Sequence, residues 1–298
     1  MEINRQGKTI SIPLKREKIE INPVPFYKKI DGETVYIVLT RFNEKAASEV
    51  KKAFETLKQE GIKSLILDLR SNPGGLLGEA VNISNFFLPK GTTITTTKAK
   101  VKKWSNTYLS RNNPLDLEIP IVVLINGSSA SASEIVTGAL QDYDRAVVMG
   151  KRSFGKGLVQ RFRALSYGTQ LKVTISKYYT PSGRCIQELD YANRDLKTGK
   201  VPKFSDAGVN EFRTQNGRVV FDGGGINPDI ITENEMVTEE TKILLNSRAL
   251  FNFAIHFKNK NNRITSAKEF RFTNTDFKQF QSFLKTGYNV SNKRRNIL

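Results

Sequence analysis

The sequence predicts an α/β fold, and the order of its apolar runs carries that prediction. The run VYIVL from Val35 is followed by a helical pattern over about 44–60 and by the apolar strand SLILDL. The runs IVVLI at 121–125 and AVVMG at 146–150 continue the series. Continuously apolar strands in a β-α-β rhythm are typical of a sheet that is covered on both faces. We therefore expect such a sheet at the centre of the molecule.

The chain divides into three expected regions. Residues 1–25 alternate polar and apolar side chains before two prolines, which predicts one or two edge strands and a linker. Residues 26–232 carry the β-α-β pattern and form the expected core. Residues 233–298 lose the strand pattern and place leucine and phenylalanine among helix-forming residues, which predicts a small, mainly helical region.

Composition and charge exclude some classes of protein. Of 298 residues, 38% are hydrophobic and 26% charged, as in globular chains, and no apolar run approaches the roughly 18 residues needed to cross a bilayer. The first twenty residues lack the order of a secretory signal peptide. The net charge of +18 is compatible with a nucleic-acid partner, but the basic residues are spread along the chain without a nucleic-acid motif. A solvated basic surface is the favoured interpretation.

Two residue counts constrain the chemistry. Cys185 is the only cysteine, so a disulfide framework and a cysteine-based metal site are excluded, and no cofactor is expected. His256 is the only histidine, and it lies far along the chain from every glycine- or serine-rich loop. A Ser-His-Asp hydrolase would therefore have only one histidine available as its base, and the position of that histidine in the sequence does not favour this role.

A serine-rich loop, NGSSASASE, joins one of the apolar strands to a helical pattern. A hydroxyl at the start of a helix meets partial positive charge and free backbone N–H groups. Such a place suits a nucleophile whose attack creates an oxyanion. Ser129, Ser131 and Ser133 are equally well explained as helix N-caps, so this loop alone leaves both interpretations open.

Two further loops, which also follow apolar strands, could meet the serine loop at one crevice and complete an acyl-transfer site. With histidine nearly absent, the base for a serine would be Lys, Asp, Glu or a chain amine. Lys156 in SFGKG lies between two glycines, which permit close approach, although most lysines are simply surface charges. Gly74 and Gly75 in DLRSNPGG could direct backbone N–H groups at a reacting carbonyl oxygen, or could form a plain turn.

The stretches LILDLRSNPGG, NGSSASASEIVTGALQD and SFGKGLVQ occur in this order. They resemble the signature blocks of the C-terminal processing peptidases, or tail-specific proteases, and the resemblance spans roughly residues 1–232. It implies a β-β-α (crotonase/ClpP-like) peptidase core that hydrolyses peptide bonds near unstructured protein C-termini. It also implies a bacterial cell-envelope, periplasmic or secreted location, and it leaves a homo-oligomer open.

The resemblance also implies the roles of individual residues. Ser131 corresponds to the nucleophile, Lys156, 25 residues later, to the general base, and Gln160 to the residue that orients the lysine. Asp142 occupies a position implicated in some members, and a structural role is favoured for it over a catalytic one.

The implied oxyanion donors are backbone N–H groups. One is that of Ala132, and the other is that of Gly74 or Gly75, between which the spacing does not decide.

The first residues depart from the family pattern. Members of the family usually carry a whole PDZ domain before the core, whereas RQGKTISIPLKREKIEI resembles only the final strand of one. We therefore expect residues 1–25 to be the remnant of a PDZ domain, with its linker.

Three other functions compete with a peptidase. A non-catalytic peptide- or lipid-binding relative on the same fold has no need for Ser131, Lys156 and Gln160 together. A crotonase-like acyl-CoA enzyme normally uses Asp or Glu as acid and base, where these loops offer serine and lysine. A basic nucleic-acid-binding protein rests on the net charge alone. The motifs thus favour the serine peptidase.

Overall fold

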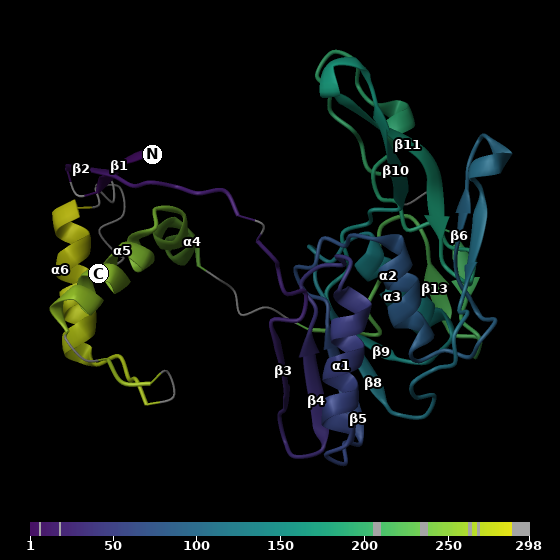
Figure 1. Ribbon diagram of the computed structural model, residues 1–298, viewed down its shortest axis with the longest axis horizontal. Coiled ribbons are helices and arrows are strands. Elements are labelled where there is room, and N and C mark those ends of the chain that lie inside the picture. Colours follow the sequence, from purple (N-terminus) through teal and green to yellow (C-terminus); the bar gives the residue numbers. More distant parts are fainter. Residues whose placement is uncertain are drawn as a thin grey trace. The chain divides into compact units, whose positions relative to one another are not determined.

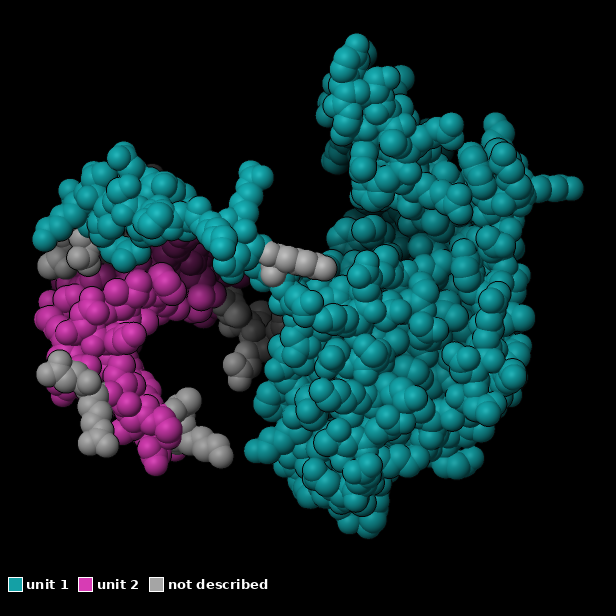
Figure 2. All heavy atoms as spheres, viewed as in Figure 1, with its two compact units in different colours: residues 1–232 teal, residues 233–298 magenta. Residues whose placement is uncertain are grey.

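The structure is a computed structural model, which describes residues 1–287 except 6, 18, 205–209, 233–237, 262–263 and 267–268. The chain forms two compact units (Figure 2). Unit 1 comprises Met1–Thr232 and unit 2 comprises Glu233–Leu298.

A six-stranded sheet forms the centre of unit 1, with the strand order β14-β9-β8-β5-β4-β3. The edge strand β3 pairs antiparallel with β4, and every other pair is parallel. Four of these strands, β4, β5, β8 and β9, match the predicted apolar runs. Their bounds are β3 Phe26–Lys29, β4 Thr34–Val38, β5 Ser64–Asp68, β8 Ile121–Ile125, β9 Val147–Gly150 and β14 Ile230–Ile231.

Three helices pack side by side against this sheet (Figure 1): α1 (Ala46–Lys58), α2 (Leu77–Asn85) and α3 (Ala132–Asp142). The rings of Phe54 and Phe87 meet edge to face, 5.5 Å between centroids, in the core between them. The strands contribute alternate residues to this core, and these are fully buried. They include Val35, Ile37, Leu65, Leu67, Val123 and Val148.

The expectation that the sheet is covered on both faces is wrong within the described residues. The alternate side chains Tyr36, Ile66, Val122 and Leu124 are only half-buried, and Val147 is 42% exposed. Successive side chains of a strand point to opposite faces, so only one set enters the helix-covered core. An apolar run cannot by itself show whether its second face is covered.

Antiparallel strands form the remaining sheets of unit 1. The larger sheet has the order β10-β11-β6-β7, and its β10–β11 pair is a hairpin that projects from the body of unit 1 (Figure 1). Near the N-terminus, β1 and β2 form a second hairpin, in agreement with the predicted edge strands. The bounds are β1 Glu2–Arg5, β2 Lys8–Ser11, β6 Thr93–Lys98, β7 Asn106–Leu109, β10 Leu158–Ala164, β11 Gln170–Tyr179, β12 Glu211–Arg213 and β13 Val219–Phe221.

Unit 2 is helical, as predicted, with α4 (Glu239–Asn246), α5 (Ala249–Lys260) and α6 (Asn274–Gly287). Phe253 and Phe280 pack at its centre, with ring centroids 5.0 Å apart. Across the described parts of both units, no helix combines the length and the apolar character that a membrane span requires.

Candidate active site

The three loops singled out in the sequence follow three neighbouring parallel strands. β5 pairs with β8 and β8 with β9, so the NPGG turn, the serine loop and the lysine loop leave the sheet side by side at one edge. Backbone hydrogen bonds join them. The N–H of Ala130 donates to the Asn72 carbonyl (3.0 Å), and that of Phe154 donates to the Ser129 carbonyl (3.0 Å). The predicted convergence of the loops is therefore present.

The structure separates the three serines that the sequence left equivalent. The hydroxyls of Ser129 and Ser133 are fully buried and donate to the carbonyls of Leu69 (2.8 Å) and Asn72 (3.0 Å). Ser131 alone of the three is partly exposed, and its backbone has φ of 57° and ψ of −112° at the N-cap of α3. Positive φ is unfavourable for a residue with a Cβ, and such strain gathers at functional sites.

Asn72 holds the NPGG turn in place. Its side chain is fully buried, donates to the Leu39 carbonyl (2.7 Å) and accepts from the N–H of Gly74 (2.9 Å). The N–H of Gly74 is thus already occupied by an acceptor. Gly75 is exposed, and its N–H has no acceptor among the residues that the structure describes.

Close packing explains why residue 74 is glycine. A Cβ added to Gly74 would lie 2.8 Å from both the Ser131 Cβ and the Ala132 backbone nitrogen, and its φ is +92°. The missing side chain keeps the space in front of the Ala132 N–H open. That N–H, like the one of Gly75, meets no acceptor in the described part of the chain.

Glu134 joins the serine loop to the lysine loop, a role that the sequence interpretation missed. Its carboxylate is fully buried, and one oxygen, Oε2, accepts the backbone N–H of both Ser131 (2.7 Å) and Lys156 (2.9 Å). The other oxygen, Oε1, accepts the N–H of Gly155 (2.7 Å) and the hydroxyl of Ser153 (2.6 Å). Burial raises the pKa of the Glu134 carboxyl above its ordinary value, against the opposing effect of these donors.

A sequence signal for Glu134 did exist. Serine followed three residues later by glutamate, at the start of an apolar helical run, is the capping-box pattern. Ser131 and Glu134 have this spacing.

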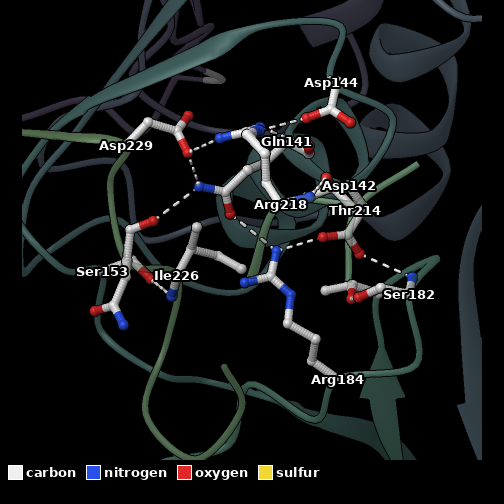
Figure 3. Close-up of polar contacts among 12 residues, drawn as sticks. Gln141, Asp142, Asp144, Ser153, Ser182, Arg184, Thr214, Arg218, Ile226 and Asp229 are labelled. Atoms are coloured by element: carbon white, nitrogen blue, oxygen red, sulfur yellow. Dashed lines mark hydrogen bonds and ion pairs between the residues drawn. The ribbon is translucent and has the colours of Figure 1, made fainter. Parts of the chain in front are cut away.

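Ser153 extends the same connection to residues 222–229, which have the sequence DGGGINPD. Its hydroxyl oxygen accepts the backbone N–H of Ile226 (2.7 Å), a contact drawn in Figure 3. On the other side of the lysine, the N–H of Gly157 donates to Gln187 Oε1 (2.8 Å). The backbone around Lys156 is therefore held on both sides.

The side chains of Lys156 and Gln160 are less constrained. Lys156 is half-buried, and its ammonium group makes no hydrogen bond or ion pair with any described residue. Gln160 is exposed on β10, opposite Thr174 and directly after an irregularity in the strand register. The structure brings the backbones of Ser131 and Lys156 together, but it shows no hydrogen bond from the Gln160 amide to a described residue.

Asp142 lies at the opposite end of α3 from Ser131, about 16 Å along the helix axis for 11 helical residues. Its carboxylate and the guanidinium of Arg184 form an ion pair of 2.5 Å in which each side chain is 1% exposed. Asp142 also accepts the N–H of Ser182 (2.9 Å), as Figure 3 shows. These contacts hold the turn at residues 181–184 against the helix, which supports a structural role for Asp142.

His256 lies in α5 of unit 2, where its ring faces Phe283 with 5.2 Å between centroids. Within the described ranges, no three His, Cys, Asp or Glu side chains gather as metal ligands.

Comparisons with known proteins identify the family. The model of "Peptidase family S41" matches residues 33–197, and that of "Probable PDZ-protease, C-terminal helical domain" matches residues 240–295. The carboxy-terminal-processing protease of Bartonella bacilliformis is 40% identical over 193 residues, which cover 63% of this chain and 44% of that protein. The "Probable CtpA-like serine protease" of Staphylococcus aureus (strain N315) is 38% identical over 190 residues, which cover 62% and 37%.

A solved structure agrees with these relatives. The photosystem II D1 C-terminal processing protease superposes with a TM-score of 0.55 at 27% identity, over 77% of this chain and 53% of that one. The chain spans less than half the length of the two curated relatives. As its three motif blocks predicted, the chain belongs to peptidase family S41, with C-terminal processing serine proteases among its relatives.

Proposed function

We propose that unit 1 is the catalytic core of a C-terminal processing serine endopeptidase, with Ser131 as nucleophile and Lys156 as general base. One observation carries the proposal. A single oxygen of the buried Glu134 carboxylate accepts the backbone N–H of both Ser131 and Lys156. Two residues that are 25 positions apart in the chain are thereby held as neighbours in one site.

The proposed reaction follows from the groups at this site. Neutral Lys156 accepts the proton of the Ser131 hydroxyl while its oxygen forms a bond to the substrate carbonyl carbon. The lysine then returns that proton to the leaving amine as the peptide bond breaks. Water hydrolyses the resulting acyl-enzyme in the same way. In this proposal Gln160 orients the lysine once substrate is bound.

The negative charge on the carbonyl oxygen needs donors that are free in the resting protein. The N–H of Ala132 and that of Gly75 meet this requirement, whereas the N–H of Gly74 is bonded to Asn72. We assign the oxyanion hole to Ala132 and Gly75. Gly74 then contributes by leaving space.

The proposed substrate is an extended, unstructured protein C-terminus. β10 is the edge strand of its sheet and begins two residues after Lys156, so its free edge can pair with a peptide that reaches Ser131. The crotonase-like character of the core, the end of a PDZ domain in β1–β2, the domain boundaries after residues 25 and 232, and a cell-envelope location remain predictions from the sequence.

Labelling with a fluorophosphonate, followed by cleavage of an unstructured test protein, tests the assignment. We expect Ser131→Ala to abolish both labelling and cleavage. Lys156→Ala and Lys156→Arg should abolish cleavage nearly as fully, because arginine stays protonated in proteins. Lys151→Arg, in the same loop, and His256→Ala should keep cleavage close to the wild-type rate.

Two results would contradict the Ser-Lys assignment. One is a wild-type rate in Lys156→Arg, and the other is an inactive but folded His256→Ala variant. Absence of both labelling and cleavage in the wild type would instead favour the non-catalytic peptide- or lipid-binding relative.

A further inference from the structure

Two lysines face each other directly across neighbouring strands. Lys98 of β6 and Lys177 of β11 are directly opposite in the antiparallel register. Like charges in such a pair destabilise a sheet. Neither lysine forms an ion pair with a described carboxylate. A bound anion would remove this repulsion.

Aromatic rings offset part of the repulsion. The ammonium of Lys98 lies 4.3 Å from the Tyr179 ring centroid, and that of Lys177 lies 5.5 Å from the Phe204 centroid. Cation–π contacts stabilise the cations but leave their charge uncompensated. The two ammonium groups therefore remain available to a negatively charged ligand.

These lysines line a cavity of about 440 Å³. Lys100 adds a third ammonium group to its wall, and Leu158, Leu189 and Phe204 supply apolar surface. A cavity with apolar walls and a few converging charges is the usual form of a binding site for a small group. This volume suffices for a substrate side chain or the end of a peptide.

Only one carboxylate lines the cavity, and it is engaged in its own loop. Asp190 accepts the N–H of Ala192 (3.1 Å) and the side-chain amide of Asn193 (2.6 Å). Its single negative charge can offset at most one of the three lysine charges. The cavity keeps an excess of positive charge.

The cavity adjoins the proposed catalytic loop. Leu158 of its wall follows Lys156 by two residues, and Gln187 of its wall accepts the N–H of Gly157 (2.8 Å). A peptide that lies across Ser131 and Lys156 therefore passes close to the cavity.

We propose that the cavity lined by Lys98, Lys100 and Lys177 is a substrate subsite that binds a carboxylate. The carboxylate is either an Asp or Glu side chain of the peptide or its free C-terminus, which share the same recognition chemistry. The inference rests on the proposed function, since it names the substrate group that this peptidase core selects.

Equilibrium binding to the full chain carrying Ser131→Ala tests the inference without cleavage. The probes are fluorescein-labelled ten-residue Ala/Ser peptides, read by fluorescence anisotropy. One series is amidated and carries a single Glu or a single Gln at each position in turn. A second pair has no charged side chain and ends in a free carboxylate or an amide. We expect one carboxylate peptide to bind about tenfold more tightly than its neutral counterpart.

Three further changes show whether this preference comes from the cavity. Lys98→Met with Lys177→Met should bring the ratio close to one, and Lys100→Met alone should lower it several-fold. The control is Lys172→Met, because Lys172 is on the same strand and also lies 5.5 Å from a ring centroid, that of Phe162, but does not line the cavity. The control should keep the full ratio.

The binding preferences distinguish two kinds of subsite. A preference for internal Glu identifies a side-chain subsite, and a preference for the free carboxylate identifies a C-terminus subsite. Equal binding of all charged and neutral pairs, or a ratio that survives the double lysine substitution, would overturn the inference. An equal loss in Lys172→Met would do so as well, since it would show general attraction to a basic surface. If the double lysine variant fails to fold, the singly substituted Lys100→Met decides.

Fluorophosphonate labelling of Ser131 in the unsubstituted chain is measured separately. Labelling without a carboxylate preference leaves the proposed function intact and rejects the subsite. A carboxylate preference without labelling does the reverse.

Discussion

The buried carboxylate of Glu134 accepts the backbone N–H of Lys156 at 2.9 Å. Glu134 is in the first turn of α3, three residues after the strained Ser131, and Lys156 lies in the loop after β9. The same carboxylate oxygen also accepts the N–H of Ser131. One buried acceptor therefore holds both backbones. This fixes the position from which each proposed catalytic side chain extends.

Replacing Glu134 with Gln should reduce turnover more than substrate binding. An amide keeps one accepting oxygen, so it cannot accept all four donors that now surround the carboxylate. The lysine loop should shift relative to Ser131, and we expect kcat to fall about 10- to 100-fold. Steady-state kinetics on an unstructured peptide measures the change, with KM nearly constant.

Glu55→Gln is the control for that substitution. Glu55 lies on α1, where its half-exposed carboxylate is 3.7 Å from the Lys51 ammonium. Its kcat should equal that of the wild type. Unchanged turnover in Glu134→Gln would show that the carboxylate does not position the loops.

The same carboxyl group should give stability a characteristic pH dependence. Burial raises the pKa of Glu134 in the folded protein above its ordinary value of 4.5. Its contribution to stability is therefore fully present below the unfolded pKa and is lost as the pH rises through the folded pKa. Denaturant unfolding of the wild type and Glu134→Gln at several pH values measures the difference in the free energy of unfolding.

We expect the wild type to lose stability relative to Glu134→Gln as the pH rises from about 4.5, and the difference to level off above the folded pKa. A difference that moves in the opposite direction would show that the four donors outweigh burial.

Gly74→Ala should block the proposed oxyanion hole. The added methyl group would lie 2.8 Å from the Ala132 nitrogen, in a backbone conformation with φ of +92°. We expect kcat to fall at least about 100-fold, the effect of losing one oxyanion donor. Gly78→Ala is the matched control, because a Cβ there meets nothing within 4 Å, and kcat should not change. Near-normal turnover in a folded Gly74→Ala protein would count against Ala132 as a donor.

The sequence was sufficient to predict that three loops meet, and the reason is topological. Parallel strands place their carboxyl ends at one edge of a sheet, so loops after β5, β8 and β9 had to lie close together. The choice among three serines was different. It depends on which hydroxyl meets a carbonyl from another loop, and those of Leu69 and Asn72 come from a segment about 60 residues away.

Other features could be recognised only from the tertiary structure. The repulsion between Lys98 and Lys177 exists only because β6 and β11 pair across 79 residues of sequence in one particular register. Likewise, the half-buried second face of the sheet follows from where the three helices pack. Apolar periodicity reports neither of these relationships.

The three serines should respond differently to substitution by alanine. Ser129→Ala and Ser133→Ala leave buried carbonyls without their donors, which should lower the free energy of unfolding by about 1–2 kcal/mol. Both variants should keep most of kcat. Ser131→Ala should be close to wild type in stability and inactive. Loss of fluorophosphonate labelling in folded Ser133→Ala, with labelling retained in Ser131→Ala, would identify Ser133 as the nucleophile and contradict the assignment of Ser131.

Asp142 provides the test that separates a structural from a catalytic carboxylate. Asp142→Asn removes the counter-charge of Arg184, which is 1% exposed, and an uncompensated buried charge should cost about 3–5 kcal/mol in thermal or denaturant unfolding. Asp144→Asn is the matched control, since its partner Arg218 is 43% exposed, and the loss there should be about 1 kcal/mol or less. Combining Asp142→Leu with Arg184→Met should recover part of the stability, because neither charge then remains buried.

The folded fraction of Asp142→Asn at low temperature should still react with fluorophosphonate at Ser131, about 16 Å away along α3. A variant as stable as the wild type but unable to react would mean that Asp142 takes part in the chemistry, and the buried ion pair would then have to be explained in another way.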